Sequence, residues 1–241
     1  MIDFESRVEL AYRNILSPGD RAIDIGAHRG RHALPMAECV GPDGWVIAFE
    51  PLPTARAALL GAVRSGRRAE AGLGVVEIRA EALADRVGQA EFVFVPDMPE
   101  CSGLRERVYD APVDVVRIDV RMALLDDVVA DRGPFRLIKI DAEGGEHDIV
   151  RGATRLLRRD RPVVLFEMGD NALVNYPHVT SAGMAEQLTA LDYRLLDILG
   201  RPLDPAAFAA SCAEQAVWDY AAVPAEQQAT IEHLQTALAA A

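Results

Sequence analysis

The feature that most constrains this chain is a regular alternation between short apolar runs and segments with helical periodicity. The apolar runs are rich in valine, isoleucine, leucine and phenylalanine, as in strands buried on both faces of a parallel sheet. They occupy residues 22–26, 45–49, 75–78, 135–141 and 163–167. Strands that alternate with helices form a doubly wound sheet with right-handed crossovers and helices on both faces. The sequence therefore predicts an α/β fold with a mostly parallel sheet.

The remaining segments extend this pattern in both directions. Residues 4–16 place apolar side chains three and four positions apart, which predicts an amphipathic helix before the first strand. We expect further strands at 91–95, 113–120, 193–199 and 216–223, and helices at 54–64, 124–130, 146–159 and 182–191. A segment rich in proline and alanine, which ends at Gln215, is expected to leave the sheet before the closing strand.

The C-terminal segment, 225–241, carries Ile231, Leu234 and Leu238 on one helical face among many alanines. Such a helix packs either on its own domain or on a second copy of the chain. The sequence leaves both alternatives open, and the second would make a homodimer through the C-terminal helix.

The charge and the cysteine content exclude several classes of protein. A net charge of −12 repels phosphate backbones and anionic lipids, so we expect no nucleic-acid and no membrane partner. No apolar run approaches the roughly 18 residues of a membrane span, and Asp3 and Glu5 stand where a signal peptide carries positive charge. The cysteines, Cys39, Cys101 and Cys212, are widely spaced and lack metal-ligand spacing, which indicates a reducing compartment. These features predict a cytoplasmic protein.

The first strand ends in a turn, 24–30, whose two glycines have the spacing GxxxG. In dinucleotide sites a further glycine lets the backbone approach a pyrophosphate, whereas His28 puts a side chain in that position. We therefore expect a ligand without a pyrophosphate. Gly26 permits a positive φ and close contact with a ligand, and Gly30 lets the next helix start tight against the strand. Because glycine pairs are common in turns, an ordinary turn remains the alternative.

Glu50 follows the second apolar strand directly and lies 24 positions after Gly26. This is the place of the acid that accepts hydrogen bonds from ribose hydroxyls in nucleotide-binding sheets. The alternative is a solvated acid before Pro51. The fully apolar strand in front of Glu50 favours the ribose-binding role.

These residues and several later motifs carry a resemblance to a known family. The motifs are the turn 24–30, Glu50-Pro51, Leu125-Asp126-Asp127, the block 138–146 with Lys-Ile-Asp-x-Glu-Gly-x-Glu, Gly152-Ala153 and 162–167. In order and spacing, over residues 20–168, the chain resembles the FkbM family of S-adenosylmethionine-dependent methyltransferases. It departs from that family at two positions. Asparagine is more frequent at the position of His28, and a bulky aliphatic residue is more frequent at the position of His147.

The resemblance implies a class I methyltransferase fold, Rossmann-like, with a seven-stranded sheet whose last strand is antiparallel. It implies S-adenosylmethionine over the first two strands, with S-adenosylhomocysteine as product, and methyl transfer to a hydroxyl oxygen. Glu81 would then lie near the exocyclic amine of adenine and Ala82 near its ring, and Ser102 would line the pocket. The implied cofactor-binding residues are Asp24, Gly26, Ala27, His28, Gly30, Glu50, Pro51, Glu81, Ala82 and Asp141.

The end of the strand 135–141 is the expected place of the chemistry. Strand alternation puts Lys139 and Asp141 on the same side, with Asp141 last. Beside a sulfonium, this carboxylate could bind the methionine ammonium, favour the cationic sulfur or orient the acceptor. An alcohol is a poor nucleophile at neutral pH, so a base within hydrogen-bond reach should help. The candidate bases are Asp141, Glu143, Glu146 and His147.

Several of these residues have a structural alternative. Glu143 and Glu146 could simply complement the positive end of a helix dipole, which we favour for Glu146, whereas we favour the site for Glu143. His147 is four residues after Glu143 and could face the same cleft. Lys139 should pair with Asp141 or Glu167. Asp141, Glu167 and Asp170 could together supply oxygen ligands to a divalent metal, but we expect no metal there.

The sequence thus predicts one domain over 1–241, with an N-terminal helix in 1–17, a cofactor-binding core in 20–168, and sheet completion and a C-terminal helix in 169–241. We expect an S-adenosylmethionine-dependent O-methyltransferase acting on a hydroxyl of a sugar or a polyketide-like small molecule. The alternatives are an NAD-dependent oxidoreductase of similar topology and a cofactor-binding or interaction module without turnover.

Overall fold

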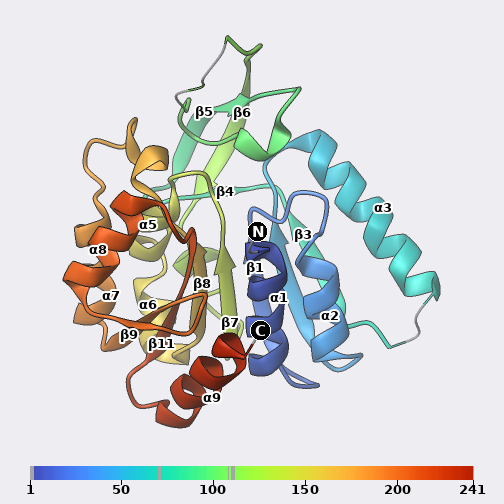
Figure 1. Cartoon of the computed structure of the whole chain (residues 1–241). Helices are drawn as coiled ribbons and strands as arrows, with labels where there is room; N and C mark the ends of the chain where they lie inside the picture. Colours follow the sequence, from blue (N-terminus) through green and yellow to red (C-terminus); the bar gives the residue numbers. More distant parts are fainter. Residues whose placement is uncertain (1–2, 70–71, 108, 110–111, 241) are drawn as a thin grey trace.

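The apolar runs form the centre of an eight-stranded sheet in the computed structural model, which describes residues 3–69, 72–107, 109 and 112–240 (Figure 1). Met1, Ile2 and Ala241 of the expected domain lie outside the described residues. The parallel strands are β1 (Arg21–Ile25), β2 (Trp45–Phe49), β3 (Val75–Arg79), β7 (Leu137–Ile140) and β8 (Val163–Glu167). Most of their side chains are buried because helices cover both faces of the sheet.

The C-terminal strands complete the sheet beyond β8. Strand β11 (Asp219–Pro224) pairs antiparallel with β8, and β9 (Tyr193–Asp197) pairs antiparallel with β11. The spatial order is β10-β9-β11-β8-β7-β1-β2-β3. The expected class I fold is confirmed, and β11 is antiparallel to both of its neighbours, as expected for the last strand. The described sheet has one strand more than expected, because the two-residue β10 (Pro202–Leu203) adds an edge.

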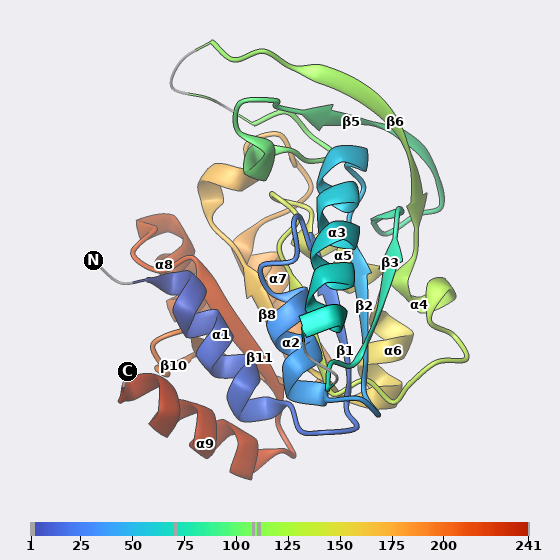
Figure 2. The ribbon, with the colours of Figure 1, turned by 90° about the vertical axis from the view of Figure 1, so that its right-hand side faces the viewer.

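The helices divide between the two faces of the sheet. One layer contains α1 (Phe4–Ile15), α2 (Ala33–Val40), α3 (Pro53–Ala69) and α9 (Gln228–Ala239). The other contains α4 (Leu125–Val128), α5 (Glu146–Arg151), α6 (Thr154–Asp160), α7 (Ser181–Ala190) and α8 (Pro205–Glu214). Two 3₁₀ turns complete the assignment, η1 (Pro99–Cys101) and η2 (Asp170–Leu173). Figure 2 shows α1 and α9 side by side at the outside of the first layer.

Helix α9 packs on its own domain. Its apolar residues Ile231, Leu234 and Leu238 are buried in the same core cluster as Val8 and Tyr12 of α1. The structure thus shows the first of the two packings that the sequence left open. A homodimer through the C-terminal helix stays a prediction, and it would have to use the remaining surface of α9.

Two segments expected in the main sheet belong to a separate one. Strands β4 (Ala82–Leu83), β6 (Val116–Ala123) and β5 (Gly88–Phe94) form a three-stranded sheet, in which β5 and β6 are antiparallel. The expectation of strands alternating with helices throughout was wrong here. Residues such as Glu91 and Asp119 alternate with apolar ones, a pattern typical of antiparallel strands with one solvated face.

The expected helix over 146–159 is also wrong in its middle, where it breaks into α5 and α6. A Cβ atom on Gly152 would lie 2.2 Å from the carbonyl oxygen of Ala84, so the chain passes too close there for any side chain.

The proline- and alanine-rich segment contains a helix, α8. Asp204 caps it by accepting a hydrogen bond from the Ala207 N–H at 2.8 Å, and Pro205 starts its first turn.

The topology brings the carboxyl ends of four parallel strands to one edge. Ile25 is level with Phe49 on one side and with Ile140 on the other, and Ile140 is level with Phe166. Ligands bind at this edge in doubly wound sheets. Among the described residues, none of the helices has the length and apolar character needed to cross a membrane.

Candidate active site

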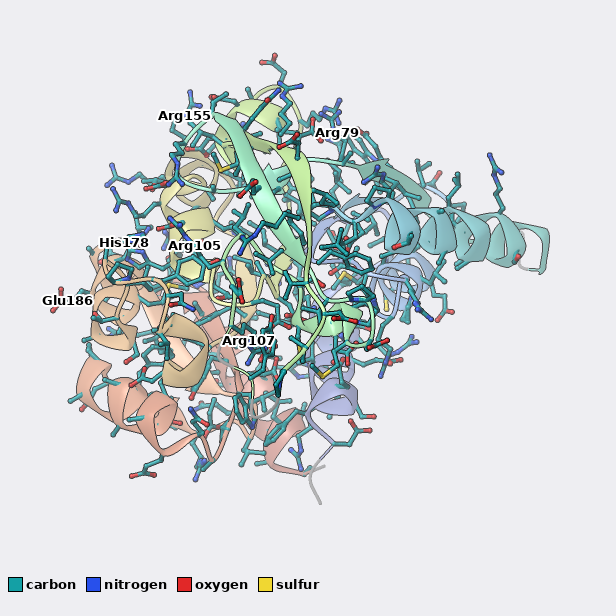
Figure 3. All side chains as sticks on the ribbon, turned by 90° about the horizontal axis from the view of Figure 1, so that it is seen from above. Arg79, Arg105, Arg107, Arg155, His178 and Glu186 are labelled. Atoms are coloured by element: carbon teal, nitrogen blue, oxygen red, sulfur yellow. The ribbon has the colours of Figure 1, made fainter. Side chains whose placement is uncertain are left out.

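A cavity of about 340 Å³ opens at the carboxyl ends of β1, β2 and β7. Figure 3 looks down on this end of the molecule, with Arg79 at the end of β3 and Arg107 among the labelled side chains. Of the predicted cofactor-binding residues, the cavity is lined by Gly26, Ala27, His28, Glu50, Pro51, Glu81, Ala82 and Asp141. The cavity thus brings together eight of the ten predicted cofactor-binding residues, because these residues lie at strand ends or in the turns that follow them.

The turn after β1 is closed tightly against β7. Gly26 has a φ of +78°, and a Cβ atom there would lie 1.8 Å from the carbonyl oxygen of Asp141. The N–H groups of Gly26 and Ala27 both donate to the Phe49 carbonyl at 3.0 Å. His28, which is not a glycine, has a φ of +46°, an unfavourable conformation that the tight turn imposes.

Asp24 and Gly30, the other two predicted cofactor-binding residues, do not line the cavity. Asp24 is completely buried, and neither carboxylate oxygen has a hydrogen-bond partner among the described residues. Burial raises the pKa of Asp24. A Cβ atom on Gly30 would lie 2.8 Å from Leu59 Cδ1, so this glycine lets α3 pack against the turn.

Glu50 is 4 % exposed and is therefore not the solvated acid of the alternative interpretation. Its Oε2 accepts a hydrogen bond from the His28 N–H at 2.8 Å, and its Oε1 accepts one from the Leu52 N–H at 2.7 Å. Burial raises the pKa of Glu50, although these two hydrogen bonds favour the carboxylate. Each oxygen retains a further acceptor site, so the oriented carboxylate can receive two ligand hydroxyls.

Glu81 lies in the cavity wall but already has a partner. Arg79 Nη2 donates to Glu81 Oε1 at 2.6 Å, and Arg121 approaches the same oxygen at 3.9 Å. Burial alone would raise the pKa of Glu81, but the hydrogen bonds from Arg79 hold it below its ordinary value. An adenine amine near Glu81 would share this carboxylate with Arg79.

Asp141 belongs to a buried charged group at the end of β7. Lys139, 4 % exposed, donates to Asp141 Oδ2 at 2.9 Å, which confirms one of its two expected partners. Burial alone would raise the pKa of Asp141, but the Lys139 ammonium and a hydrogen bond from Glu167 hold it low. Burial and the Asp141 charge raise the pKa of Glu167 to about 10, so Glu167 is the protonated member of this pair.

Glu143 projects from a strained loop into the cavity wall. Its φ is +54°, and that of the following Gly144 is +97°. Arg107, which the sequence reasoning did not single out, forms an ion pair with Glu143. Burial and the nearby Asp141 charge raise the pKa of Glu143 to about 8, against the effect of Arg107. The ionised fraction of such a carboxyl group grows as the pH rises towards 8, and the ionised form can accept a proton.

Glu146 and His147 lie outside the cavity lining. Glu146 Oε1 accepts hydrogen bonds from the Ala142 N–H at 2.7 Å and the Gly144 N–H at 3.4 Å, so this carboxylate holds the loop that carries Glu143. Burial raises its pKa to about 7. The His147 Nδ1 has no hydrogen-bond partner among the described residues and lies 3.6 Å from Asp148 Oδ1. The structure therefore does not bring His147 to the other catalytic candidates.

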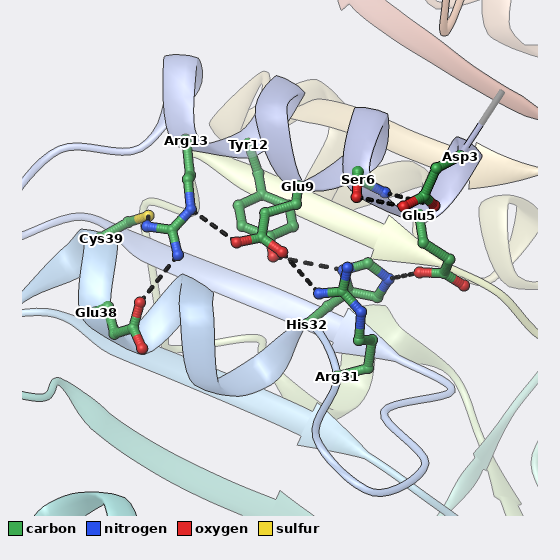
Figure 4. A network of polar contacts seen from close by, with 10 residues as sticks. All are labelled: Asp3, Glu5, Ser6, Glu9, Tyr12, Arg13, Arg31, His32, Glu38 and Cys39. Carbon is green, nitrogen blue, oxygen red and sulfur yellow. Dashed lines mark hydrogen bonds and ion pairs between the residues drawn. The ribbon is translucent and has the colours of Figure 1, made fainter. Parts of the chain in front are cut away.

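Helix α1 contributes a residue that no sequence signal indicated. Glu5 lines the cavity, and its Oε2 lies 2.6 Å from the Nε2 atom of the buried His32 (Figure 4). Arg31 bridges to the same helix through Glu9 Oε2 at 2.7 Å. The network in Figure 4 thus ties the start of α1 to the turn region. Only the tertiary packing places Glu5 there, because it is distant in sequence from every strand end.

The remaining motifs have structural roles in the described structure. Ser102 lines the cavity, and its Oγ accepts a hydrogen bond from the Val95 N–H at 3.1 Å. Asp126 caps α6 by accepting hydrogen bonds from the Arg155 N–H at 2.9 Å and the Leu156 N–H at 2.7 Å. Within the ranges that the structure describes, no group of three or more His, Cys, Asp or Glu side chains is arranged to hold a metal ion.

The cavity has a strongly acidic lining. Its only Lys or Arg side chains among the described residues are Arg31 and Lys139, whereas its acids are Glu5, Glu50, Glu81, Glu100, Asp141, Glu143 and Glu167. Glu143 and Glu167 hold protons near neutral pH, but the other five acids still outnumber Arg31 and Lys139, so the lining favours a cationic ligand and opposes a pyrophosphate. The oriented carboxylate of Glu50 at one end and the acids around Asp141 at the other would fit a nucleoside that carries a cationic amino-acid chain.

Comparisons with known proteins agree with this chemistry. A family described as "Methyltransferase FkbM domain" matches residues 24–195. Among solved structures, the chain is similar to a methyltransferase FkbM of Methylobacillus flagellatus KT, with a TM-score of 0.51 and 14% identity. That alignment covers 88% of this chain and 49% of the other, so the chain spans about half the length of that protein.

A second similar structure is a proposed rRNA methylase of Clostridium thermocellum. The TM-score is 0.52 at 11% identity, with 92% of this chain and 94% of the other covered. At these identities the two structures show the fold alone. No curated protein matches the sequence at a significant level.

Proposed function

This chain belongs to the FkbM family of methyltransferases and has S-adenosylmethionine as its cofactor, and from that premise we propose that it methylates a hydroxyl oxygen of a small molecule. The acceptor class that we propose is a sugar or a polyketide-like natural product. The observation that carries the proposal is the acidic cavity, which combines a tight glycine turn, the oriented carboxylate of Glu50 and the charged group around Asp141.

The residues present fit this cofactor. The carboxylate of Glu50 would bind the ribose hydroxyls, and the wall of Glu81 and Ala82 would lie along the adenine. Asp141, held ionised by Lys139, would face the ammonium or the sulfonium. The bound cofactor supplies an electrophilic methyl group on a positively charged sulfur. The task of the protein is then to hold an acceptor oxygen about 3 Å from that carbon.

We assign the role of general base to Glu143. The proton of the acceptor hydroxyl would move to the Glu143 carboxylate as the oxygen–carbon bond forms and the sulfur–carbon bond breaks. Glu143 suits this role because it lines the cavity and has a pKa of about 8. Glu146 would position Glu143 by holding the loop between them.

The test is calorimetry with S-adenosylhomocysteine and with NAD⁺. We expect micromolar binding of S-adenosylhomocysteine and none of NAD⁺, because the acidic lining opposes a pyrophosphate. Glu50→Ala should weaken S-adenosylhomocysteine binding by about 1–3 kcal/mol, through the loss of charge-assisted hydrogen bonds to the ribose. The exposed Glu186 provides a matched control, since Glu186→Ala should leave the affinity unchanged.

Two results would contradict the proposal. NAD⁺ binding in place of S-adenosylhomocysteine would favour the oxidoreductase alternative. An unchanged affinity in Glu50→Ala would remove Glu50 from the site. With the cofactor established, a panel of sugar and polyketide-like alcohols, compared with amines of the same skeleton, tests oxygen as the methyl acceptor.

A further inference from the structure

A second, polar cavity adjoins the cofactor cavity. It has a volume of about 620 Å³ and lies beside β5, between the segment 104–107 and the residues Asn175 and Tyr176. Leu104 lines both cavities, so the two meet at this segment. We call the second cavity the arginine groove, because its lining includes Arg86, Arg105, Arg107 and Arg117.

The wall between the two cavities is formed by the proposed base and one of these arginines. Glu143 lines the cofactor cavity, Arg107 lines the arginine groove, and the two side chains form an ion pair. Tyr176 lines the groove as well, and its hydroxyl lies 3.8 Å from the position of a Cβ atom on Gly145, which lines the cofactor cavity. A molecule in the groove would therefore lie beside Arg107, the ion-pair partner of Glu143.

The groove differs in charge from the rest of the molecule. The chain carries a net charge of −12 and the charged lining of the cofactor cavity is mainly acidic, whereas the groove lining has four arginines against three acids, Glu91, Glu106 and Asp148. Arg117 pairs with Glu106 at 2.8 Å, and Arg86 pairs with Asp85 at 3.3 Å. Arg105 is exposed and forms no ion pair with a described residue; Figure 3 shows it and Arg107 from above.

One further polar group in the groove lacks a partner. Tyr176 is 3 % exposed, and its hydroxyl has no hydrogen-bond partner among the described residues. A buried hydroxyl without a partner costs free energy, so such groups are rare unless a ligand or water completes them. Arg105 and Tyr176, neither of which has a polar side-chain partner among the described residues, thus line one cavity.

We propose that the arginine groove binds the methyl acceptor through an anionic group, a carboxylate or a phosphate. Arg105 would anchor the anion, because a guanidinium matches both groups with paired hydrogen bonds. The acceptor hydroxyl would then extend past Arg107 to Glu143. This inference rests on the proposed function, since it names the class of acceptor for the same reaction.

The experiment uses the full chain saturated with S-adenosylhomocysteine and three sugars: glucose, glucuronate and glucose 6-phosphate. We expect at least one charged sugar to bind about tenfold more tightly than glucose in calorimetry, because it adds charge-assisted hydrogen bonds. A preference for glucuronate identifies a carboxylate, and a preference for glucose 6-phosphate identifies a phosphate. Equal binding of all three, or no binding of either charged sugar at tens of millimolar, overturns the proposal.

Two variants and a control locate the site. Arg105→Ala should remove the preference for the charged sugar, and Arg64→Ala, an exposed arginine on α3, should retain it. A preference that survives in Arg105→Ala overturns the assignment to the groove. Tyr176→Phe should weaken binding of the charged sugar about threefold. It should leave thermal stability unchanged or higher, because the hydroxyl has no partner among the described residues to lose. Lower stability with unchanged sugar binding would make Tyr176 a purely structural residue and remove its support for the groove.

The affinity for S-adenosylhomocysteine separates this proposal from the proposed function. It should be unchanged in Arg105→Ala, since Arg105 does not line the cofactor cavity. If the wild-type chain binds S-adenosylhomocysteine but neither charged sugar, only the acceptor inference fails. If it binds no S-adenosylhomocysteine, the proposed function itself fails.

Discussion

The cofactor cavity and the arginine groove are neighbours with opposite charge and different origins. The cofactor cavity is bounded by turns that follow β1, β2 and β7, and the charged residues of its lining are mainly acidic. The groove is bounded by β5, by the segment 104–107 and by the residues before α7, and its lining contains four arginines and three acids. A cationic cofactor and an anionic acceptor would each meet complementary charge, which would keep the two ligands in separate places.

The difference also concerns rigidity. Backbone groups of the sheet hold the cofactor cavity: both Gly26 and Ala27 donate to Phe49, and Asp141 donates its N–H to the Ile25 carbonyl at 3.1 Å. The groove wall depends more on side-chain pairs, such as Arg107 with Glu143 and Arg117 with Glu106. We infer that the edge of the main sheet fixes the position of the cofactor, whereas the segments around the groove determine which acceptor binds.

The largest expected effect comes from a change that should break the cofactor cavity. Gly26→Ala puts a Cβ atom 1.8 Å from the Asp141 carbonyl oxygen at a positive φ, so we expect it to lower the free energy of unfolding by more than about 2 kcal/mol and to abolish S-adenosylhomocysteine binding. Chemical denaturation and calorimetry measure both effects. Gly103→Ala, beside Glu143 at 3.3 Å and without a positive φ, should be milder.

Gly61 on the exposed side of α3 controls for the substitution itself. A Cβ atom there meets nothing within 4 Å, so Gly61→Ala should raise the free energy of unfolding by about 0.5–1 kcal/mol. If Gly26→Ala behaved like Gly61→Ala, the close contact between the ends of β1 and β7 would not hold in solution.

The next effect concerns the charged group around Asp141. Asp141→Asn should keep the fold, because losing the Asp141 charge lowers the pKa of Glu167, which can then ionise and compensate Lys139. Turnover should fall by about 100-fold or more, since the charge facing the cofactor has moved. Circular dichroism and single-turnover rates measure these results. A wild-type rate in a folded Asp141→Asn variant would place the essential carboxylate elsewhere.

The smallest predicted effect is a pH dependence of cofactor binding that arises from Glu143, which stands between the two cavities. Burial raises the pKa of Glu143 to about 8, so this carboxylate gains its charge as the pH rises through 8. The preference for cationic S-adenosylmethionine over neutral S-adenosylhomocysteine should therefore grow by up to about tenfold between about pH 6 and pH 9. Calorimetry at several pH values tests this. Glu143→Gln should flatten the dependence and Glu186→Gln should not; a constant ratio in the wild type would contradict it.

Glu143 and two other buried acids also predict how the free energy of unfolding changes with pH. Between about pH 5 and pH 8 the unfolded chain has released the Glu143 proton while the folded protein still holds it. The free energy of unfolding without ligand should therefore fall as the pH rises through this range. Glu146 and Asp219, whose pKa values burial raises to about 7, act in the same direction.

Residues at strand ends were the predictable part of the site. Gly26, Glu50 and Asp141 follow apolar runs that are recognisable in the sequence, and the ends of parallel strands must meet at one edge. Glu5 and Arg107 were not predictable in this way, because neither follows a strand end of the main sheet. The residues 91–95 and 113–120 were recognised as strands, but the choice of sheet depends on pairing across the whole molecule.

The sequence by itself determined the doubly wound sheet and the places of the glycine turn and of Glu50 at the ends of the first two strands, since these depend on local periodicity and on glycine geometry. Only the tertiary structure decided that Glu143 pairs with Arg107, that Glu167 takes the proton beside Asp141 and that His147 lies outside the cavity. Protonation and ion pairing depend on burial and on charges brought together from distant segments, and no local pattern encodes those distances.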